Sequence, residues 1–409
     1  MNKLKDTVCI VCGSDANAYY MSRCWHELTN TKALVLAKSP LPYTEYSDIL
    51  DIKYNSTIWE EEGFLSALYN IKQSICKKYV LLIASNETYS GFISKNKDEL
   101  TEKGFLFNYP DKNIINTFMY KDKFYKAYEN SPLAFAKTYY YDCATDTDLP
   151  ENLTYPLVLK PANVIAYNHL NFANKCKIYK VNNQTEAQGV INNLKYGGYR
   201  DTLIIQDFIP GDDSYLFDCV VYCDKYGSVK MQTLAQIGLQ EQTKNMVGNA
   251  AVLINGINTH GENGDILSNI KSFMQSTGYT GFAELDLKYD YRDGCFKVLE
   301  INARQGRCSF YINTLGCNPV RLLYEDLVEN NIPDYGVLSN KALLSFVPWG
   351  IVKKYCKDEK FKAEAIHLWK TRVSPVKYSK DKNLKRRLYL LKKKFRYYKD
   401  YKNSYWSGR

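Results

Sequence analysis

The sequence predicts an α/β domain with a doubly wound, mostly parallel sheet, then an α+β region with antiparallel sheets and a basic, helical C-terminal extension. Three observations support this fold class. Strand-like and helix-like segments alternate through about the first 118 residues, short strands joined by turns begin near residue 150, and basic side chains concentrate after residue 376. We expect the three regions to be residues 1–118, 119–330 and 331–409.

The N-terminal region alternates apolar runs rich in β-forming residues with segments of helical spacing. The expected strands are residues 8–12, 33–37, 49–53 and 79–84, and the expected helices are residues 18–28 and 60–76. Ligands of such sheets bind beyond the carboxyl ends of the strands. Two loops of small and polar residues lie there, 13–17 and 85–88. Each is either a plain turn or part of a ligand site.

The second region has a different pattern, with strands that follow one another through short turns. The expected strands are residues 157–160, 178–181, 203–208, 216–223 and 229–235. Further on, residues 281–289 and 295–301 flank the turn Asp290-Tyr-Arg-Asp-Gly294, which is a strong β-hairpin signal. These features predict antiparallel sheets.

Charge is unevenly distributed along the 409 residues, whose formal net charge is +10. Residues 377–402 hold twelve basic and two acidic side chains, which leaves 42 of each sign in the rest. A neutral body argues against a nucleic-acid-binding field over the whole molecule. With 45% hydrophobic and 24% charged residues, the composition is that of a folded protein and not of a disordered one.

The apolar runs are short, and this bears on location. None approaches the roughly 18–20 residues that span a bilayer, and the five apolar residues before Gly13 are too few for the core of a signal peptide. We therefore expect a cytoplasmic protein.

Its twelve cysteines are dilute and irregularly spaced, and Cys9-x-x-Cys12 lacks a second pair, so buried reduced thiols are expected rather than disulfides or zinc.

The predicted hairpin carries the sharpest chemical pattern. Asp286 lies on its first strand, and Glu300-Ile-Asn302-Ala-Arg304-Gln-Gly-Arg307 follows the turn. Residues two apart on a strand share a face, so Glu300, Asn302 and Arg304 should point the same way, with Asp286 beside Glu300. Two carboxylates and a carboxamide oxygen suit Mg²⁺, and the arginines would meet the charge of a phosphoryl group. The alternative is a surface hairpin with ordinary salt bridges.

Two further segments have the character of a nucleotide site. Lys160 ends the buried strand of residues 157–160, where a lysine must meet an anion, either a phosphate or a structural carboxylate. In residues 203–213 an apolar strand runs into Asp207-Phe-Ile-Pro-Gly-Asp-Asp213. A base could stack on Phe208 and bond to the backbone there, or the segment is simply a strand followed by a turn.

In this order the three elements resemble the ATP-grasp superfamily, whose fold clamps ATP and Mg²⁺ between two α+β subdomains. The resemblance covers about residues 119–330, and the N-terminal α/β unit matches the domain that usually precedes that fold. A second ATP lysine is expected about fifteen residues before a Pro-Lys-Thr, for which Ala136-Lys137-Thr138 stands here. This points to Lys121, with Lys123 as the alternative.

The resemblance implies a role for each matched residue. Lys121 and Lys160 would hold phosphates, Gln206, Asp207, Phe208 and Ile209 would form the adenine hinge, Asp213 would take the ribose hydroxyls, Asp286, Glu300 and Asn302 would hold Mg²⁺, and Arg304 and Arg307 would be catalytic.

Longer strings are similar to those of D-aspartate ligases of Gram-positive bacteria. They include Gly13-Ser-Asp-x-Asn17-x-Tyr, Gln206-Asp-Phe-Ile-Pro-Gly-Asp-Asp-Ser and Tyr279-Thr-Gly-Phe-Ala, with Lys288-Tyr-Asp-x-Arg-Asp-Gly and Glu300-Ile-Asn-x-Arg-Gln-Gly-Arg. Such enzymes activate the β-carboxylate of D-aspartate with ATP and join it to the lysine ε-amine of the peptidoglycan stem peptide. The similarity therefore implies D-aspartate as the substrate and a UDP-linked muramyl pentapeptide as the acceptor.

Two departures from the family pattern concern the substrate contacts. The lid segment after Lys160 and Pro161, residues 162–167, has no glycine or serine, and Ser85-Asn86-Glu87 differs from the Gly-Asp that relatives tend to carry. The ATP motifs do not identify the acid, so an ATP-grasp ligase for another amino acid or amine is the alternative within the class.

The basic tail allows a function of another class. Leu384, Leu388, Leu391 and Phe395 form an apolar i, i+4, i+7, i+11 stripe among lysines and arginines, as in a basic amphipathic helix. Either these leucines pack on the body while the lysines stay solvated, or the tail binds an anionic membrane surface, a nucleotide sugar or nucleic acid. If the tail binds an anionic membrane surface, the protein would be in peripheral contact with the inner face of the membrane.

Overall fold

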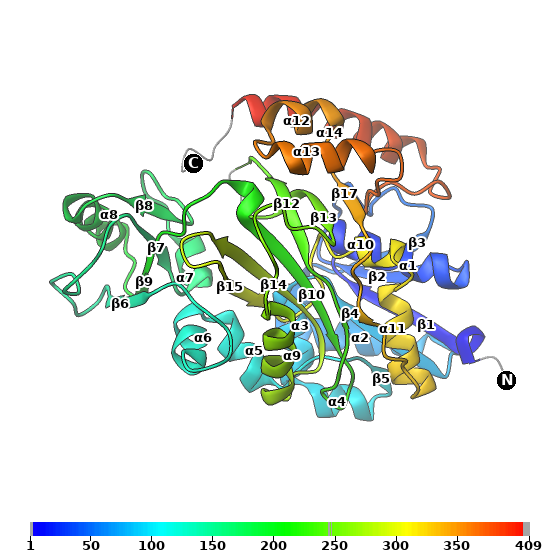
Figure 1. Cartoon of the computed structure of the whole chain (residues 1–409). Helices are drawn as coiled ribbons and strands as arrows, with labels where there is room; N and C mark the ends of the chain where they lie inside the picture. Colours follow the sequence, from blue (N-terminus) through cyan, green and yellow to red (C-terminus); the bar gives the residue numbers. More distant parts are fainter. Residues whose placement is uncertain (1–2, 244–245, 247, 404–409) are drawn as a thin grey trace.

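The computed structural model describes residues 3–243, 246 and 248–403, and their strands form three sheets (Figure 1). A five-stranded parallel sheet belongs to the N-terminal region, an eight-stranded sheet lies in the centre, and a four-stranded antiparallel sheet forms a separate lobe on the left of Figure 1. This mixed architecture confirms the fold class that the sequence predicts.

The N-terminal sheet has the strand order β3-β2-β1-β4-β5, and all of its neighbouring strands are parallel. Its strands are β1 (Thr7–Cys12), β2 (Ala33–Ala37), β3 (Leu50–Tyr54), β4 (Tyr79–Ala84) and β5 (Phe105–Leu106). The helices of this region are α1 (Ala16–Thr29), α2 (Glu61–Gln73), α3 (Glu87–Lys95), α4 (Lys97–Glu102) and α5 (Lys112–Met119), with 3-10 turns at Lys3–Asp6 and Ser56–Trp59. The four predicted strands and two predicted helices are all present.

The small sheet has the order β6-β9-β7-β8. Its strands are β6 (Thr138–Asp142), β7 (Leu157–Pro161), β8 (Tyr179–Val181) and β9 (Thr202–Asp207), and its helices are α7 (Val164–His169) and α8 (Gln184–Tyr196), with α6 (Lys121–Tyr128) before it. α8 packs its apolar residues Ala187, Ile191 and Leu194 into the core of this lobe. The lobe therefore has a core of its own.

The central sheet runs β15-β14-β10-β12-β13-β17, with β11 and β16 attached beside β10. Its strands are β10 (Leu216–Cys223), β11 (Val229–Gln232), β12 (Ala235–Gln240), β13 (Ala250–Asn255), β14 (Gly281–Asp290), β15 (Cys295–Asn302), β16 (Gly336–Val337) and β17 (Ala342–Ser345). The associated helices are a 3-10 turn at Asp213–Tyr215, α9 (Ile266–Ser276), α10 (Tyr311–Thr314), α11 (Pro319–Tyr324) and a π-helical turn at Glu325–Glu329.

One predicted strand is in fact two. The single strand expected over residues 229–235 divides into β11 and β12, which both pair with β10. The break lies at Thr233, whose hydroxyl accepts a hydrogen bond from Val220 N at 3.0 Å in place of a backbone partner. The continuous apolar pattern hides this interruption because the residues on both sides of it are buried.

The region expected as a C-terminal extension contributes to the central sheet. β16 pairs with β11, and β17 pairs with β13. Beyond them, α12 (Trp349–Tyr355), α13 (Glu359–His367) and α14 (Leu384–Lys402) lie together along the top of Figure 1. The boundary at residue 330 stays a prediction, although the chain after it is not a detached appendage.

The basic helix α14 turns the predicted apolar stripe away from the body. Leu384, Leu388, Leu391 and Phe395 are 64%, 55%, 49% and 65% exposed. The interpretation that these leucines pack on the body is therefore wrong. Arg386, Tyr397 and Tyr401 form the buried face instead, because polar tips on long side chains can reach partners below the helix.

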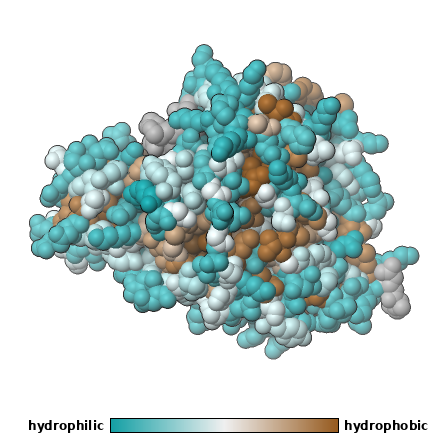
Figure 2. Space-filling model, viewed as in Figure 1, coloured by the Kyte–Doolittle hydropathy of each residue, from teal (hydrophilic) through white to brown (hydrophobic). Residues whose placement is uncertain are grey.

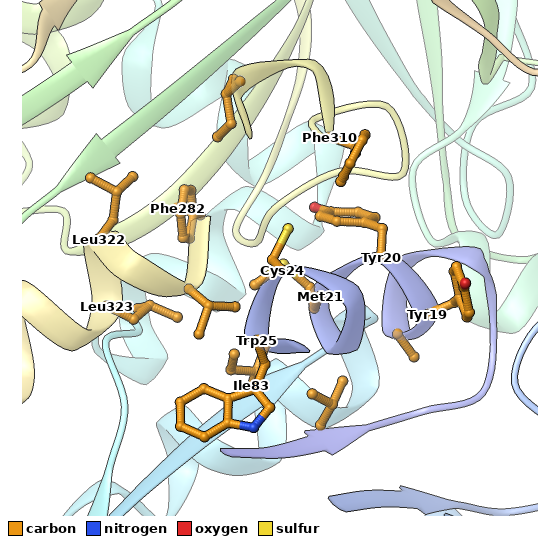
Figure 3. Packing of buried hydrophobic residues seen from close by; sticks show 14 of the residues in the cluster. Tyr19, Tyr20, Met21, Cys24, Trp25, Ile83, Phe282, Phe310, Leu322 and Leu323 are labelled. Atoms are coloured by element: carbon orange, nitrogen blue, oxygen red, sulfur yellow. The ribbon is translucent and has the colours of Figure 1, made fainter. Parts of the chain in front are cut away.

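The N-terminal and central sheets share one hydrophobic core, shown in Figure 3. In it, Tyr20 of α1 contacts Phe310 edge to face with ring centroids 5.9 Å apart, and Ile83 of β4 belongs to the same cluster as Phe282 of β14 and Leu322 of α11. The shared core fixes the loops at the ends of β1 and β4 against the central sheet.

None of the helices in the described part of the chain has the length and apolar character needed to span a bilayer.

Candidate active site

The β14–β15 hairpin gathers acidic and amide side chains on one face of the central sheet. Asp286 pairs with Glu300 across the hairpin, and Glu284 pairs with Asn302. Residues directly opposite each other, or two apart on a strand, project to the same side. β10 adds Asp218, which pairs with Asp286 from the other edge. The structure thus brings Asp286, Glu300 and Asn302 together, as the hairpin pattern predicts.

The pKa values of these carboxyl groups are shifted in opposite directions. Burial and the neighbouring Glu300 raise the pKa of Asp286 well above its ordinary value, and burial and Asp218 do the same for Glu284. The pKa of Glu300, in contrast, is lowered to about 2 because the ammonium group of Lys121 lies against it. A cation among these side chains would relieve the repulsion and favour the ionised form of Asp286.

Two lysines from different elements converge on Glu300. Lys121, at the start of α6, forms an ion pair with the Glu300 carboxylate. Lys160 is buried at the end of β7, its Nζ lies 3.2 Å from the Tyr125 hydroxyl, and its charge also lowers the pKa of Glu300. Lys123, the alternative to Lys121, is exposed. Lys121 is therefore the lysine that faces the acidic cluster.

The donor set of the hairpin fits Mg²⁺. In the described residues, no group of three or more His, Cys, Asp or Glu side chains is arranged to hold a metal ion by itself. Mg²⁺ commonly takes only one or two protein carboxylates and completes its shell with water and phosphate oxygens. Asp286 and Glu300 supply two carboxylates, and Asn302, whose Nδ2 lies 3.5 Å from Asp286 Oδ2, supplies a carboxamide.

Arg304 joins this cluster to the N-terminal domain. β15 ends at Asn302, yet the Arg304 guanidinium still reaches the acidic face, 3.7 Å from the Glu284 carboxylate. Its other partner is Glu87, at the start of α3. A Cβ atom on Gly306 would overlap the Glu284 carboxylate, so a larger residue there would force that carboxylate to move.

Both N-terminal loops that the sequence marks as possible ligand loops end beside this arginine. Asn17 donates from Nδ2 to the carbonyl oxygens of Ser85 and Gln305, both at 2.9 Å. The Asn17 Oδ1 atom is buried and has no hydrogen-bond partner among the described residues. Asp15 is close enough for the charge of Arg304 to lower its pKa, although burial raises that pKa more. The loops at 13–17 and 85–88 therefore line one side of the site.

Arg307 is held by Glu241 and Phe346. Its Nη2 lies 2.5 Å from Glu241 Oε1, and its guanidinium stacks 3.8 Å from the centroid of the Phe346 ring. Tyr397, on α14, donates to the same Glu241 oxygen at 3.0 Å. The Nη1 atom of Arg307 has no hydrogen-bond partner in the part of the chain that the structure describes.

The expected hinge, residues 206–209, crosses from the small lobe toward the central sheet. Gln206 is buried and donates to Thr138 Oγ1 at 2.7 Å, which fixes its side chain within the small sheet. Asp207 Oδ1 is buried without a hydrogen-bond partner among the described residues, and burial raises the pKa of this carboxyl. Ile209 is buried as well. The Gln206 side chain is therefore held within the small sheet, and the backbone N–H groups of Asp207 and Phe208 donate to Lys137 O at 3.0 Å and Pro156 O at 3.2 Å.

Two lysines lie near the ring of Phe208. The Nζ atoms of Lys180 and Lys288 lie 4.2 Å and 5.4 Å from its ring centroid. Burial lowers the pKa of Lys288 to about 8. A flat ring with cations nearby suits a base and its attached phosphates.

Asp213, the predicted ribose contact, is turned toward β12. It is 5% exposed, and its carboxylate accepts hydrogen bonds from Gln240 N at 3.0 Å and Gln240 Nε2 at 2.9 Å. Its role in binding ribose stays a prediction.

Sequence reasoning gave no role to several residues of this site. They are Tyr125, Asp218, Glu241, Glu284 and Lys288, while Glu87 was noted only as part of the loop 85–88. Glu284 and Lys288 carried a local signal, because they lie two residues before and after Asp286 on one strand and must share its face. Tyr125, Asp218 and Glu241 come from elements distant in sequence, so only the folded chain places them here.

The comparisons with known proteins agree with this geometry. A curated D-aspartate ligase from Enterococcus faecium (strain Aus0004) is 32% identical over 403 residues, which cover 95% of this chain and 94% of that protein. No protein-family model matches the chain.

Solved structures show the same fold at low identity. L-amino acid ligase from Bacillus licheniformis gives a TM-score of 0.55 at 16% identity, over 78% of this chain and 73% of that one. N5-carboxyaminoimidazole ribonucleotide synthetase in its ADP complex gives 0.60 at 11% identity, over 90% and 97%. The corresponding synthetase from Staphylococcus aureus with ADP gives 0.57 at 13%, over 82% and 81%.

With two lobes, converging lysines and an acidic hairpin on this fold, the chain is an ATP-grasp carboxylate–amine ligase, which uses ATP and Mg²⁺ to form a C–N bond. The identity of 32% over nearly its whole length then shows which family of this class it is in. The chain belongs to the D-aspartate ligase family.

Proposed function

We propose that the carboxylate substrate is D-aspartate, activated at its β-carboxylate, and that the acceptor is the lysine ε-amine of a UDP-linked muramyl pentapeptide. The observation that carries this proposal is the 32% identity to a D-aspartate ligase across 95% of the chain. It is supported by the strings shared with that family at both N-terminal loops and at the hairpin.

The reaction needs activation of the acid because a carboxylate cannot expel oxide. Transfer of the γ-phosphoryl group of ATP to the β-carboxylate oxygen breaks the bond to ADP and gives an acyl phosphate. The amine nitrogen then attacks the acyl carbon, phosphate leaves with the bonding electrons, and the nitrogen loses a proton. The products are the amide, ADP and phosphate.

We assign the ATP contacts to residues of both lobes. Lys121 and Lys160 would hold the phosphates, since their ammonium groups already converge on Glu300. Residues 206–209 would contact adenine, and Asp213 the ribose. Asp286, Glu300 and Asn302 would hold Mg²⁺, which when bound shields the phosphate charges from the incoming carboxylate.

The arginines belong on the acid side of the site in this proposal. Arg304 lies between the hairpin and the loop of Glu87, where negative charge on the acyl phosphate and the tetrahedral intermediate would develop. Arg307 keeps Nη1 without a partner among the described residues and can donate from it to a substrate oxygen. Asn17 Oδ1 is an acceptor of matching kind for an ammonium group.

We also propose that the protein works in the cytoplasm, with its basic tail in peripheral contact with the inner face of the membrane.

The test is ADP formation by the purified protein with each enantiomer of aspartate and of other amino acids, with and without UDP-linked muramyl pentapeptide. We expect turnover only with D-aspartate plus the pentapeptide, and an adduct whose mass exceeds that of the pentapeptide by one aspartyl residue. A pentapeptide whose lysine ε-amine is acetylated is the matched control. Equal turnover with L-aspartate, or with the acetylated acceptor, would refute the assignment.

The alternative within the class is a ligase for another acid. Glu87 stands where relatives tend to carry Gly-Asp, and its carboxylate forms an ion pair with Arg304. If the same assay shows turnover with a different amino acid and none with D-aspartate, this substitution is the first place to look for the cause.

A further inference from the structure

α14 has two faces of opposite character. The inner face holds Arg386, Tyr397 and Tyr401, which are 1%, 4% and 2% exposed and bond to the body. The outer face carries large apolar side chains that touch water. A helix so firmly attached does not need an apolar outer surface for its own stability.

The outer apolar residues form a continuous stripe, which we call the α14 stripe: Leu384, Leu388, Leu391 and Phe395. At 100° per residue they fall within about 60° of arc and extend about 17 Å along the helix. Each is between 49% and 65% exposed. Figure 2 shows apolar residues among hydrophilic ones at the edge of the molecule where α12–α14 lie.

Cations border the stripe on both sides. Lys385, Lys392 and Arg396 project on one flank, and Arg387 and Lys394 on the other, at about 60–120° from the centre of the stripe. All five are exposed. The one acidic residue of the helix is Asp400, near its end.

A cationic cavity opens beside the second flank. Its volume is about 540 Å³, and its lining includes Arg372, Lys377, Lys393 and Lys394, with aromatic rings such as that of Trp369. None of the described residues that line it is acidic. This cavity thus offers a site for an anionic group close to the edge of the stripe.

We propose that the α14 stripe docks on an anionic phospholipid bilayer, with its apolar residues at the acyl boundary and its flanking cations among the headgroups. This inference rests on the peripheral contact already proposed and adds the face of the helix and the lipid that it meets. A basic amphipathic helix that lies in the interface plane combines the same two features, and each basic residue near an anionic surface strengthens binding about fivefold.

The charge pattern selects this occupant over others. A second copy of the chain would bring the same cations against each other around a narrow apolar contact. Nucleic acid would satisfy the cations and leave the four apolar side chains without a partner. An anionic bilayer satisfies both at once.

The experiment measures flotation of the full-length protein with vesicles of phosphatidylcholine alone or mixed with phosphatidylglycerol. We expect binding only to the mixed vesicles, weakened by salt. The double variant L388D/L391D should reduce the bound fraction about tenfold or more, because it places two carboxylates in the stripe. Y226D is the matched control, since Tyr226 is 82% exposed but lies in the β10–β11 turn.

Three outcomes would overturn the proposal: equal binding of L388D/L391D and the unmodified protein, equal binding to neutral and mixed vesicles, or no vesicle binding with a dimer that L388D/L391D dissociates. Ligase activity with soluble pentapeptide is a separate readout. Neither substitution touches the catalytic residues, so activity should persist in L388D/L391D even where vesicle binding is lost. Failure of the D-aspartate assay would leave the vesicle result intact.

Discussion

At the scale of single residues, the site is defined by charges that the fold forces together. Asp286 and Glu300 face each other across the hairpin, and Lys121 holds Glu300 ionised. Asp286 forms no ion pair among the described residues, and burial and Glu300 raise its pKa more than the charge of Lys121 lowers it. A divalent cation is the partner that this arrangement calls for.

Replacing Asp286 should therefore affect the metal-dependent step more than folding. We expect D286N to lower kcat about 100-fold to 1,000-fold, as for the loss of one preorganised electrostatic group, and to raise the Mg²⁺ concentration needed for half-maximal rate. ADP release titrated with Mg²⁺ measures both. D51N, at an exposed surface ion pair with Lys32, should behave like the unmodified protein, and a D286N protein with an unchanged Mg²⁺ requirement would contradict the assignment.

Lys393 gives a residue-scale prediction about pH. Burial and Arg396 lower its pKa to about 8 from the ordinary 10.5. Below pH 8 the lysine is protonated in both the folded and the unfolded state, so its full destabilising effect is present. As pH rises from about 8 to 10.5, the folded protein loses this proton first, and the destabilisation disappears.

K393M should thus be more stable than the unmodified protein at pH 7 by roughly 1–2 kcal/mol, a value reduced for the partial solvent access of the side chain. The difference in unfolding free energy should shrink toward pH 10. Urea denaturation across this pH range measures it. K392M, which alters the exposed neighbour, should show no such trend; a trend in both variants would point to net charge instead.

At the scale of elements, α14 contacts the end of β12 and the residue that follows it, Glu241. Tyr397 donates to Glu241, which holds Arg307, and the Tyr401 hydroxyl donates to the Gln240 carbonyl at 2.6 Å. The sequence predicts a helix at α14, and the structure adds what it contacts. In the proposed assignment of Arg307 to the acid side of the site, Tyr397 would be a positioning residue behind the arginine.

Y397F should lower kcat about threefold to tenfold and change KM for ATP little. Arg307 keeps its ion pair with Glu241, but the Glu241 carboxylate is no longer held in one orientation by Tyr397. The variant should also lose about 1 kcal/mol of unfolding free energy with the hydrogen bond. Steady-state kinetics and thermal unfolding measure the two effects. Y398F, one residue further on a ring that is 45% exposed, is the control. Stability loss with unchanged kcat would reduce Tyr397 to a structural role.

At the scale of the whole molecule, the tail is part of the fold. Asp381, 2% exposed, accepts hydrogen bonds from the Tyr19 hydroxyl and from Ser47 Oγ, both at 2.8 Å. Arg386, 1% exposed, lies 3.2 Å from the same carboxylate and stacks on the Tyr19 ring. The C-terminal segment therefore closes the molecule against its own N-terminal domain.

Deletion of residues 377–409 should destabilise the protein, since it uncovers the surface under α14 and leaves the buried Tyr19 hydroxyl without Asp381. A buried polar group left without its hydrogen-bond partner costs about 1–3 kcal/mol. Thermal unfolding with and without ATP measures the change. L388D/L391D, whose sites are exposed, should keep the unmodified melting temperature; a fully stable deletion variant would contradict the buried contacts.

The parts of the site that the sequence predicts are those whose residues are close along the chain. The hairpin turn and the alternation of strand residues place Asp286, Glu300 and Asn302 together without further information. Glu87 and Glu241 could not be found this way, because each reaches its arginine from another element across more than 60 residues. The face on which Leu388 and Leu391 lie was equally open, since an apolar stripe fits burial and exposure alike.

By itself, the sequence determined the parallel N-terminal sheet, the antiparallel hairpin and the residue types suited to phosphate and Mg²⁺. These follow from periodicity and local spacing, which act over a few residues. Only the tertiary structure decided which lysine meets Glu300, that Arg304 and Arg307 are held by Glu87 and Glu241, and that α14 buries polar residues and exposes apolar ones. Those outcomes depend on packing between distant segments, where burial and charge pairing are settled only once the chain has closed.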